Sequence, residues 1–180
     1  MELKIHTIDT APDASRPILE GLKADVGVVP NFAGTVAESP VLMSAFEGIR
    51  RAVAGMNPVD REVAGIAVGV AVDNHYGVAF HSTVAAGLGV SEDDLALMRA
   101  GSPPADPRLA AVYGFARDLV VSRGKAASVD GLTAQGLSTA EILDVVAECI
   151  LASFVGVVDN LAGRVELDAF LKAREWEPAG

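Results

Sequence analysis

The chain has 180 residues and a formal net charge of −10, from 14 Lys and Arg against 24 Asp and Glu. This acidic balance argues against nucleic acids and anionic membranes as partners, because both are bound through Lys and Arg patches. The single Cys excludes an internal disulfide and any metal site built from several cysteines. Hydrophobic residues make up 51% of the chain and aromatic residues only 5%, so small side chains must fill the core.

The first part of the chain contains repeated helix start signals. Residues 1–12 are expected to form an extended arm, because apolar residues alternate loosely there. Ser or Asn followed by Pro favours a helix start, since the side chain caps the helix and proline suits its first turn. These signals, or a proline alone, predict helices that begin at Pro17, Ser39-Pro40 and Asn57-Pro58.

The third of these helices is expected to run through Val72 and to be buried, because Val63–Val72 is entirely apolar. Gly65 and Gly69, four residues apart, would lie on one face and leave a groove for a close neighbouring helix. The apolar runs Val63–Val72 and Cys149–Val158 have ten residues each, and a membrane-spanning helix needs about 20. We therefore expect no membrane insertion and a cytoplasmic location.

The second half of the chain continues the helical pattern. Residues 73–87 are predicted to form the next helix, and the tail of residues 164–176 is amphipathic. Capping residues predict further helix starts at Ser91, Asp106-Pro107 and Ser138. No strand pattern occurs outside the arm. The sequence therefore predicts an all-α fold of helix pairs joined by short turns, with one helical domain over residues 13–176.

Two of the three histidines, His75 and His81, lie six residues apart in one predicted helix. Glu62 begins an otherwise unbroken apolar run, and a carboxylate at the edge of a buried helix needs a partner. A histidine on the neighbouring helix would be such a partner. Glu62 would then fix the imidazole tautomer and raise its pKa, which would make a proton relay. The same pair is also compatible with a satisfied core contact that has no chemical role.

The spacing of these residues resembles the alkylhydroperoxidase D / carboxymuconolactone decarboxylase-like family, whose motif is Glu followed by Cys-x-x-Cys-x-x-x-His. Twelve residues after Glu62, this chain reads Asn74-x-x-Gly77-x-x-x-His81. The resemblance runs from about Asp9 to Asp168 and implies an alkylhydroperoxidase D-like bundle of antiparallel helix pairs. Further segments resemble the peroxidase-related branch, at residues 29–32, 39–40, 60–62, 88–91, 137–142, 160–162 and 165–168.

The chain departs from the family at both cysteine positions, where Asn74 and Gly77 stand. In the family the cysteine pair reduces peroxides, a reaction that needs a thiolate nucleophile and a resolving thiol. The only sulfhydryl, Cys149, lies within an apolar run and is expected to be buried. We therefore do not expect a disulfide-cycling peroxidase.

The resemblance implies that Glu62 and His81 are the catalytic residues, with His81 as acid and base. Asn74, His75 and Tyr76 are expected to line the pocket, and Gly77 to enlarge it by vacating the space of a cysteine. For His75 an exposed helix start, and for Tyr76 simple packing, remain open. No metal is predicted, because the two histidines would point about 120° apart on one helix, and no cofactor is predicted.

Three functions stay open at this stage. The first is a cysteine-free carboxymuconolactone decarboxylase-like enzyme that decarboxylates or isomerises a small organic molecule by acid–base chemistry. The second is a non-catalytic oligomer of the same fold that binds a ligand or a partner. The third is a residual peroxidase that uses the thiol of another molecule. The resemblance also implies a homo-oligomer, as a dimer, trimer or hexamer.

Overall fold

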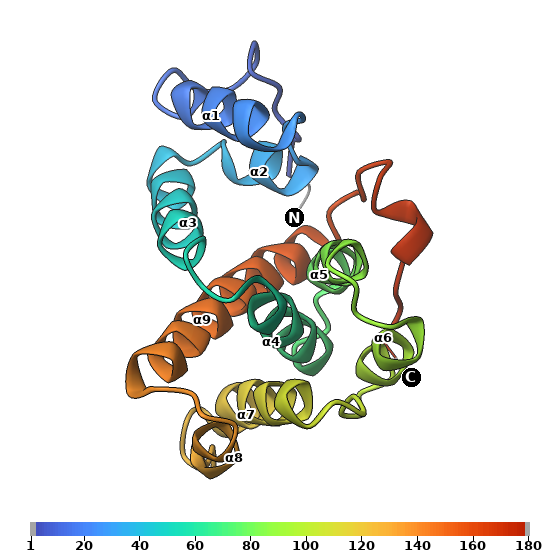
Figure 1. The fold of residues 1–180 in the computed structure, drawn as a ribbon. Coiled ribbons are helices and arrows are strands. Elements are labelled where there is room, and N and C mark those ends of the chain that lie inside the picture. Colours follow the sequence, from blue (N-terminus) through green and yellow to red (C-terminus); the bar gives the residue numbers. More distant parts are fainter. Residues whose placement is uncertain (1–2, 179–180) are drawn as a thin grey trace.

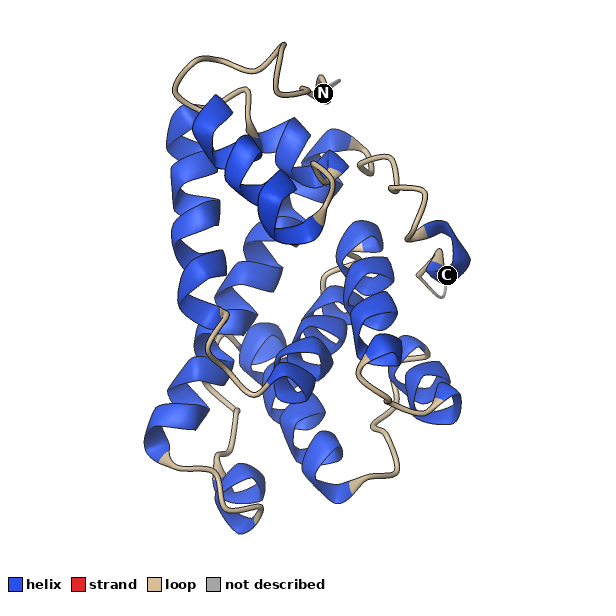
Figure 2. Ribbon diagram, turned by 45° about the horizontal axis from the view of Figure 1, so that its top comes forward, coloured by secondary structure: helices blue, strands red, loops and turns tan. Residues whose placement is uncertain are grey.

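The computed structural model describes residues 3–178, and these residues form helices and no strand (Figures 1 and 2). The all-α fold class predicted from the sequence is therefore confirmed. In chain order the elements are α1 (Arg16–Val26), α2 (Asn31–Val36), α3 (Pro40–Val53), α4 (Pro58–Ala71), α5 (His75–Gly87), α6 (Glu92–Arg99), α7 (Pro107–Ser122), α8 (Asp130–Ala134), α9 (Thr139–Ala162) and a 3-10 turn η1 (Lys172–Arg174).

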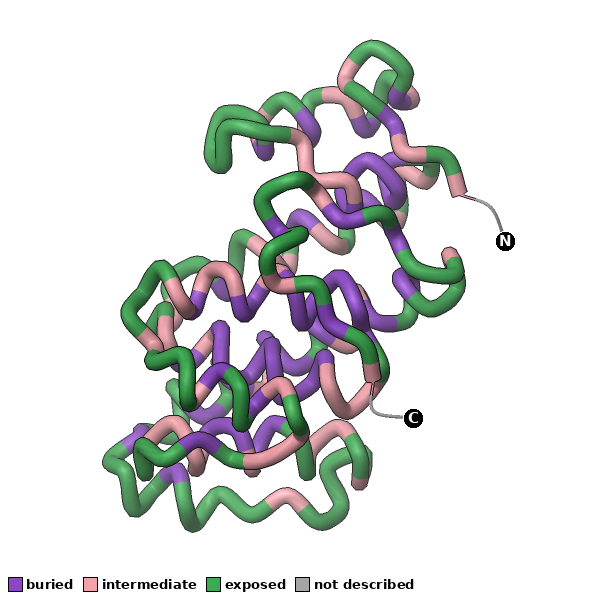
Figure 3. Tube along the Cα trace, turned by 90° about the vertical axis from the view of Figure 1, so that its right-hand side faces the viewer, coloured by how far each residue is buried: buried purple, intermediate pink, exposed green. Residues whose placement is uncertain are grey.

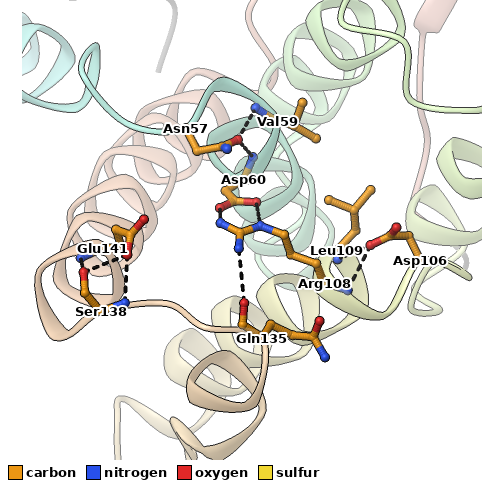
Figure 4. A network of polar contacts seen from close by, with 9 residues as sticks. All are labelled: Asn57, Val59, Asp60, Asp106, Arg108, Leu109, Gln135, Ser138 and Glu141. Carbon is orange, nitrogen blue, oxygen red and sulfur yellow. Dashed lines mark hydrogen bonds and ion pairs between the residues drawn. The ribbon is translucent and has the colours of Figure 1, made fainter.

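The helix starts follow from local capping. Asn57 Oδ1 accepts hydrogen bonds from the backbone N–H groups of Val59 and Asp60, and Ser138 forms a full capping box with Glu141 (Figure 4). Ser39, Ser91 and Asp106 cap α3, α6 and α7 in the same way. The short helices α2 and α8 were not expected, because neither carries a capping side chain.

The described residues before α1 and after α9 form no α-helix. Residues 1 and 2 of the expected arm lie outside the described residues, and the described part forms loops and turns. His6 is buried there, with its backbone N–H bonded to the Gly34 carbonyl at 3.0 Å. The amphipathic tail after α9 contains only η1, and in Figure 1 this segment, in red, runs past α5 toward α6.

The core has two parts, visible as the buried segments of Figure 3. One lies among α4, α6, α7, α8 and α9, and the other among α1, α2, α3, α5 and the tail. α4 is the central element of the first part, and its residues 62–69 are all buried. Its start is tied to α7, because Arg108 donates to Asp60 at 2.6 and 3.2 Å (Figure 4).

α4 and α5 form an antiparallel pair joined by residues 72–74. A Cβ atom on Gly65 would lie 2.5 Å from the His81 ring, and one on Gly69 would lie 2.8 Å from the Val78 side chain. Later positions on α4 therefore face earlier positions on α5, as in antiparallel packing. The predicted glycine groove exists, and it is the surface on which the His81 imidazole lies.

None of the helices in residues 3–178 has both the length and the apolar character needed to cross a membrane. The longest of them, α9, has 24 residues.

Candidate active site

The predicted Glu62–His81 pair is present at the centre of the α4–α5 interface. His81 Nδ1 lies 2.7 Å from Glu62 Oε2, and Glu62 is completely buried. Because an ionised carboxylate only accepts, Nδ1 carries the proton and Nε2 is the ring atom free for acid–base work. The His81 side chain is 11% exposed, so its ring is not wholly sealed.

Two neighbours complete the setting of this pair. The Arg61 guanidinium donates to the second oxygen of Glu62, with Nε at 2.8 Å from Oε1. Phe80 packs against the imidazole edge-on, with ring centroids 5.4 Å apart. Together with the Gly65 backbone, these contacts fix the orientation of the His81 ring.

Glu148 on α9 is a third titratable group beside Glu62 and His81, and sequence reasoning missed it. Its Oε1 lies 3.7 Å from His81 Nε2, and the residue is completely buried. Neither of its carboxylate oxygens has a hydrogen-bond partner within the described chain. The available signal was the one that singled out Glu62, a lone carboxylate at the border of an apolar run.

Burial and mutual charge shift the protonation of all three groups. Burial, reinforced by the charge of Glu62, raises the pKa of Glu148 from 4.5 to about 7, although His81 opposes the rise. Burial also disfavours the charge on His81, but the hydrogen bond to Glu62 and the two carboxylate charges outweigh it and raise the His81 pKa. For Glu62, His81 and Arg61 overcome the effect of burial and lower the pKa.

Near neutral pH the centre therefore holds an ionised Glu62 and a Glu148 that is about half protonated, and the two carboxylates favour the protonated form of His81. One imidazole between two buried carboxylates can donate or accept a proton at low cost. Such perturbed, coupled groups are typical of acid–base centres.

The expected space at Gly77 is absent. Asn74 lies outside α5 as its N-cap, because Asp73 adopts a left-handed conformation with φ 54° and breaks the helix. Asn74 Oδ1 accepts from the Gly77 backbone N–H at 2.8 Å, and a Cβ on Gly77 would clash with the Asn74 amide. The prediction that Gly77 enlarges a pocket was therefore wrong, since the capping side chain fills that volume.

Tyr76 has a structural role, because its polar groups are bonded to two aspartates. Its hydroxyl donates to Asp168 at 2.6 Å, and its backbone N–H donates to Asp159 at 3.2 Å. These carboxylates also accept from the backbone N–H groups of Asn31 and Val165. Tyr76 therefore ties the start of α5 to the tail, and no hydrogen bond of the described chain joins it to Glu62 or His81.

His75 is not brought to His81. It opens α5 and lines a separate pocket of about 400 Å³ together with residues of the tail. It is 6% exposed, which excludes the exposed helix start that had stayed open. A second, much smaller pocket lies between Met56 and Asp144, and neither of these two pockets is lined by Glu62, His81 or Glu148.

Cys149 follows Glu148 on α9 and is buried, as expected. Burial and the neighbouring Glu148 charge raise the pKa of its thiol to about 12. A thiol in this state is not a nucleophile near neutral pH.

Comparison with known proteins relates part of the chain to a family. Residues 40–118, from α3 to α7, match the model of the Carboxymuconolactone decarboxylase family, a stretch that contains both Glu62 and His81. No curated protein sequence is significantly similar to the chain.

Solved structures share the fold over almost the full length. The alkylhydroperoxidase AhpD core of a peroxidase-related protein from Ralstonia eutropha JMP134 is 20% identical, with a TM-score of 0.80 and coverage of 93% of each chain. A peroxidase-related protein from Silicibacter sp. TM1040 is 17% identical, with a TM-score of 0.73 and coverage of 94% of this chain and 91% of that one.

A cysteine-to-alanine variant of the debrominase Bmp8, in complex with 2,3,4-tribromopyrrole, is 16% identical, with a TM-score of 0.69 and coverage of 89% of each chain. The TM-scores show a common fold. At these low identities, the reactions of these proteins are not transferred to this chain. The chain thus carries a carboxymuconolactone decarboxylase family region over residues 40–118, set in the all-helical fold of the alkylhydroperoxidase AhpD core.

Proposed function

We propose that the chain is a cysteine-free enzyme that acts on a small organic molecule by acid–base chemistry, of the decarboxylase or isomerase type. Glu62, His81 and Glu148 are its proton-handling groups. The observation that carries the proposal is a single imidazole held between two buried carboxylates, with Nδ1 2.7 Å from Glu62 and Nε2 3.7 Å from Glu148.

In this scheme His81 Nε2 transfers the proton. The Glu62 carboxylate accepts Nδ1–H, which leaves Nε2 facing Glu148 on α9 and stabilises the imidazolium. In a decarboxylation, the carbon that loses carbon dioxide takes its proton from Nε2. In an isomerisation, Nε2 removes a proton from one carbon and returns it at another.

Glu148 takes up the proton of His81 or returns it. Its pKa of about 7 lets it act as either donor or acceptor near neutral pH. Its oxygens have no fixed hydrogen-bond donor, so no other contact competes with His81 for its proton. Glu62, held by Arg61, is by contrast locked in its ionised form.

A small organic substrate is supported by the family region and by the debrominase of the same fold, which was solved with 2,3,4-tribromopyrrole. Thiol peroxidase chemistry is not supported, because the one Cys is buried and its pKa is raised to about 12. Without the two motif cysteines, Glu62 and His81 are the reactive residues of the motif that this chain retains.

The test is a turnover screen of small carboxylic acids and lactones with the wild-type protein, His81→Ala, Glu62→Gln and Glu148→Gln. We expect His81→Ala to lower kcat by about 10²- to 10⁴-fold, the usual contribution of a positioned acid or base. Tyr76→Phe is the matched control, since it removes one buried hydroxyl and leaves the three groups intact. Turnover that survives His81→Ala unchanged contradicts the proposal.

An NMR titration tests the centre without a substrate, because the chain has only three histidines. We expect the His81 pKa to lie above 6.5 and to fall in Glu62→Gln. A His81 pKa that is insensitive to Glu62→Gln would show that the two side chains are not coupled.

A specific observation favours a second candidate, a non-catalytic binding protein. Asn74 fills the volume at Gly77, and the two pockets described above do not reach His81. In that case ligands from the same screen would raise the melting temperature without being turned over. The missing hydrogen-bond partners of Glu148 argue for the enzyme, because a purely structural buried carboxylate would be expected to have such partners.

We also propose that the protein is a homo-oligomer. Leu143, Ile150 and Val157 are exposed on α9 at intervals of seven residues and so form one apolar stripe along the helix. Size-exclusion chromatography with light scattering should give more than one chain per particle, and Ile150→Lys should shift the protein toward the monomer. A strict monomer at micromolar concentration refutes this proposal.

A further inference from the structure

His75 presents a buried polar group that the proposed reaction does not use. The residue is 6% exposed, and neither of its ring nitrogens has a hydrogen-bond partner in the described chain. Buried polar atoms are nearly always paired, so an imidazole with two unpaired nitrogens calls for a ligand. Each nitrogen can bind a metal when its lone pair is free.

Two carboxylates of the tail face this imidazole. Glu175 and Glu177 alternate with Trp176 in an extended segment, so they point to one side while the indole points to the other. One oxygen of each and one His75 nitrogen lie within 4.8 Å of one another. The set therefore joins the start of α5 to a segment 100 residues later in the chain.

The tail segment is anchored, which keeps the two carboxylates near His75. The Arg99 guanidinium donates to the carbonyls of Arg174 and Glu175 at 2.8 and 2.7 Å. The Trp176 indole N–H donates in turn to the Arg99 carbonyl at 2.8 Å. Both carboxylates are exposed and can rotate, so the ligand atoms can approach each other without moving the backbone.

We propose that His75, Glu175 and Glu177 bind a divalent first-row transition-metal cation such as Zn²⁺ or Co²⁺. One imidazole and two carboxylates are ligands of this class, whereas Mg²⁺ and Ca²⁺ favour sites made of oxygen atoms alone. Bonds of about 2.0–2.2 Å need the ligand atoms somewhat closer than 4.8 Å, which the free rotation of the exposed carboxylates supplies.

The charges of the pocket favour a cation over an anion. Its wall carries the carboxylates of Glu166, Glu175 and Glu177 against the cations of Arg164 and Lys172, three against two, for a net charge of −1 from these five side chains. Arg164 is paired with Glu177 at the surface. A carboxylate has two oxygens, so Glu177 can keep this contact and still bind the cation.

The test is calorimetric titration of the full chain, first stripped with a chelator, with Zn²⁺ and with Co²⁺. We expect one cation per chain and a rise in melting temperature with Zn²⁺. The single Trp of the chain is Trp176, so Co²⁺ should also quench the intrinsic fluorescence. His75→Ala and the double variant Glu175→Gln/Glu177→Gln should each weaken binding at least about tenfold.

Glu166→Gln is the matched control, because it removes the same charge from the same pocket without removing a ligand. The double variant changes only exposed side chains, so we expect it to keep the wild-type fold. Failure of the wild type to bind either cation overturns the proposal, and so does binding that both ligand variants retain. Stabilisation by inorganic phosphate in place of Zn²⁺ would also overturn it and would identify an anion site. None of these outcomes depends on the proposed enzymatic function.

Discussion

Two buried polar clusters lie along α5, and they differ in how their carboxylates are paired. At the start of the helix, Asp159 and Asp168 each accept hydrogen bonds from donors that belong to two other residues. Six residues further on, Glu62 and Glu148 share the single imidazole of His81, and Glu148 accepts no hydrogen bond.

The difference separates a structural cluster from a chemical one. A carboxylate that accepts hydrogen bonds from fixed donors holds those donors, and with them the backbone, in place. A buried carboxylate without donors is easier to protonate, which is why the pKa of Glu148 rises to about 7. Both clusters were built from motif positions of the same short segment, so sequence proximity alone does not distinguish them.

The largest effect should come from the structural cluster. Asp159→Ala leaves the buried backbone N–H groups of Tyr76 and Val165 without an acceptor, at about 1–3 kcal/mol each, so we expect a loss of about 4 kcal/mol in the free energy of unfolding. Urea denaturation measures it. Asp159→Asn keeps one acceptor oxygen and should lose less. Equal stability of Asp159→Ala and the wild type would remove the structural role assigned to this cluster.

In the cluster of Glu62, His81 and Glu148, removing the Glu148 carboxylate should instead raise the free energy of unfolding. Because the Glu148 pKa is about 7 when folded and 4.5 when unfolded, the unfolded chain releases its proton first, and wild-type stability falls as the pH rises through this window. Glu148→Gln removes that loss and should stabilise the protein by about 2–3 kcal/mol at pH 8.

The gain from Glu148→Gln should shrink toward zero below the unfolded pKa of 4.5. Denaturation at several pH values checks this. A stability difference that does not change with pH would mean that Glu148 is paired like the two aspartates.

The close contact between Gly65 and His81 gives a third test. A Cβ at Gly65 would lie 2.5 Å from the imidazole, so Gly65→Ala must displace the ring from Glu62. We expect a loss of about 2 kcal/mol from overpacking and a His81 pKa closer to its ordinary value in an NMR titration. Gly48→Ala is the control, because Gly48 is an exposed position of α3 with open space around it, and this variant should gain up to about 1 kcal/mol in the free energy of unfolding.

The smallest change in the free energy of unfolding is expected for Tyr76→Phe. It removes the 2.6 Å hydrogen bond to Asp168, but that carboxylate keeps the backbone N–H of Asn31. The loss should be about 1 kcal/mol, measured by thermal denaturation, with no change in the His81 pKa. A shift of that pKa would show that the two clusters are coupled.

Much of the fold was predictable because its signals are local. Ser39, Asn57, Asp106 and Ser138 each bond to backbone groups two or three residues away, so a short segment contains both partners. The pairing of Glu62 with His81 was also predictable, since the two residues lie on consecutive helices and match a family spacing. The helices α2 and α8 lack capping side chains and are held by packing instead.

The sequence by itself determined the helical class, most helix starts and the loss of the cysteine pair. Only the tertiary structure decided that Glu148 lies beside His81 and Glu175 beside His75, because Glu148 lies 86 residues after Glu62 in the chain and Glu175 lies 100 after His75. It also decided that Asn74 fills the space left at Gly77, since a capping side chain is placed by the helix it caps. Such contacts depend on how helices pack against each other, and helix packing is set by the whole core rather than by any local pattern.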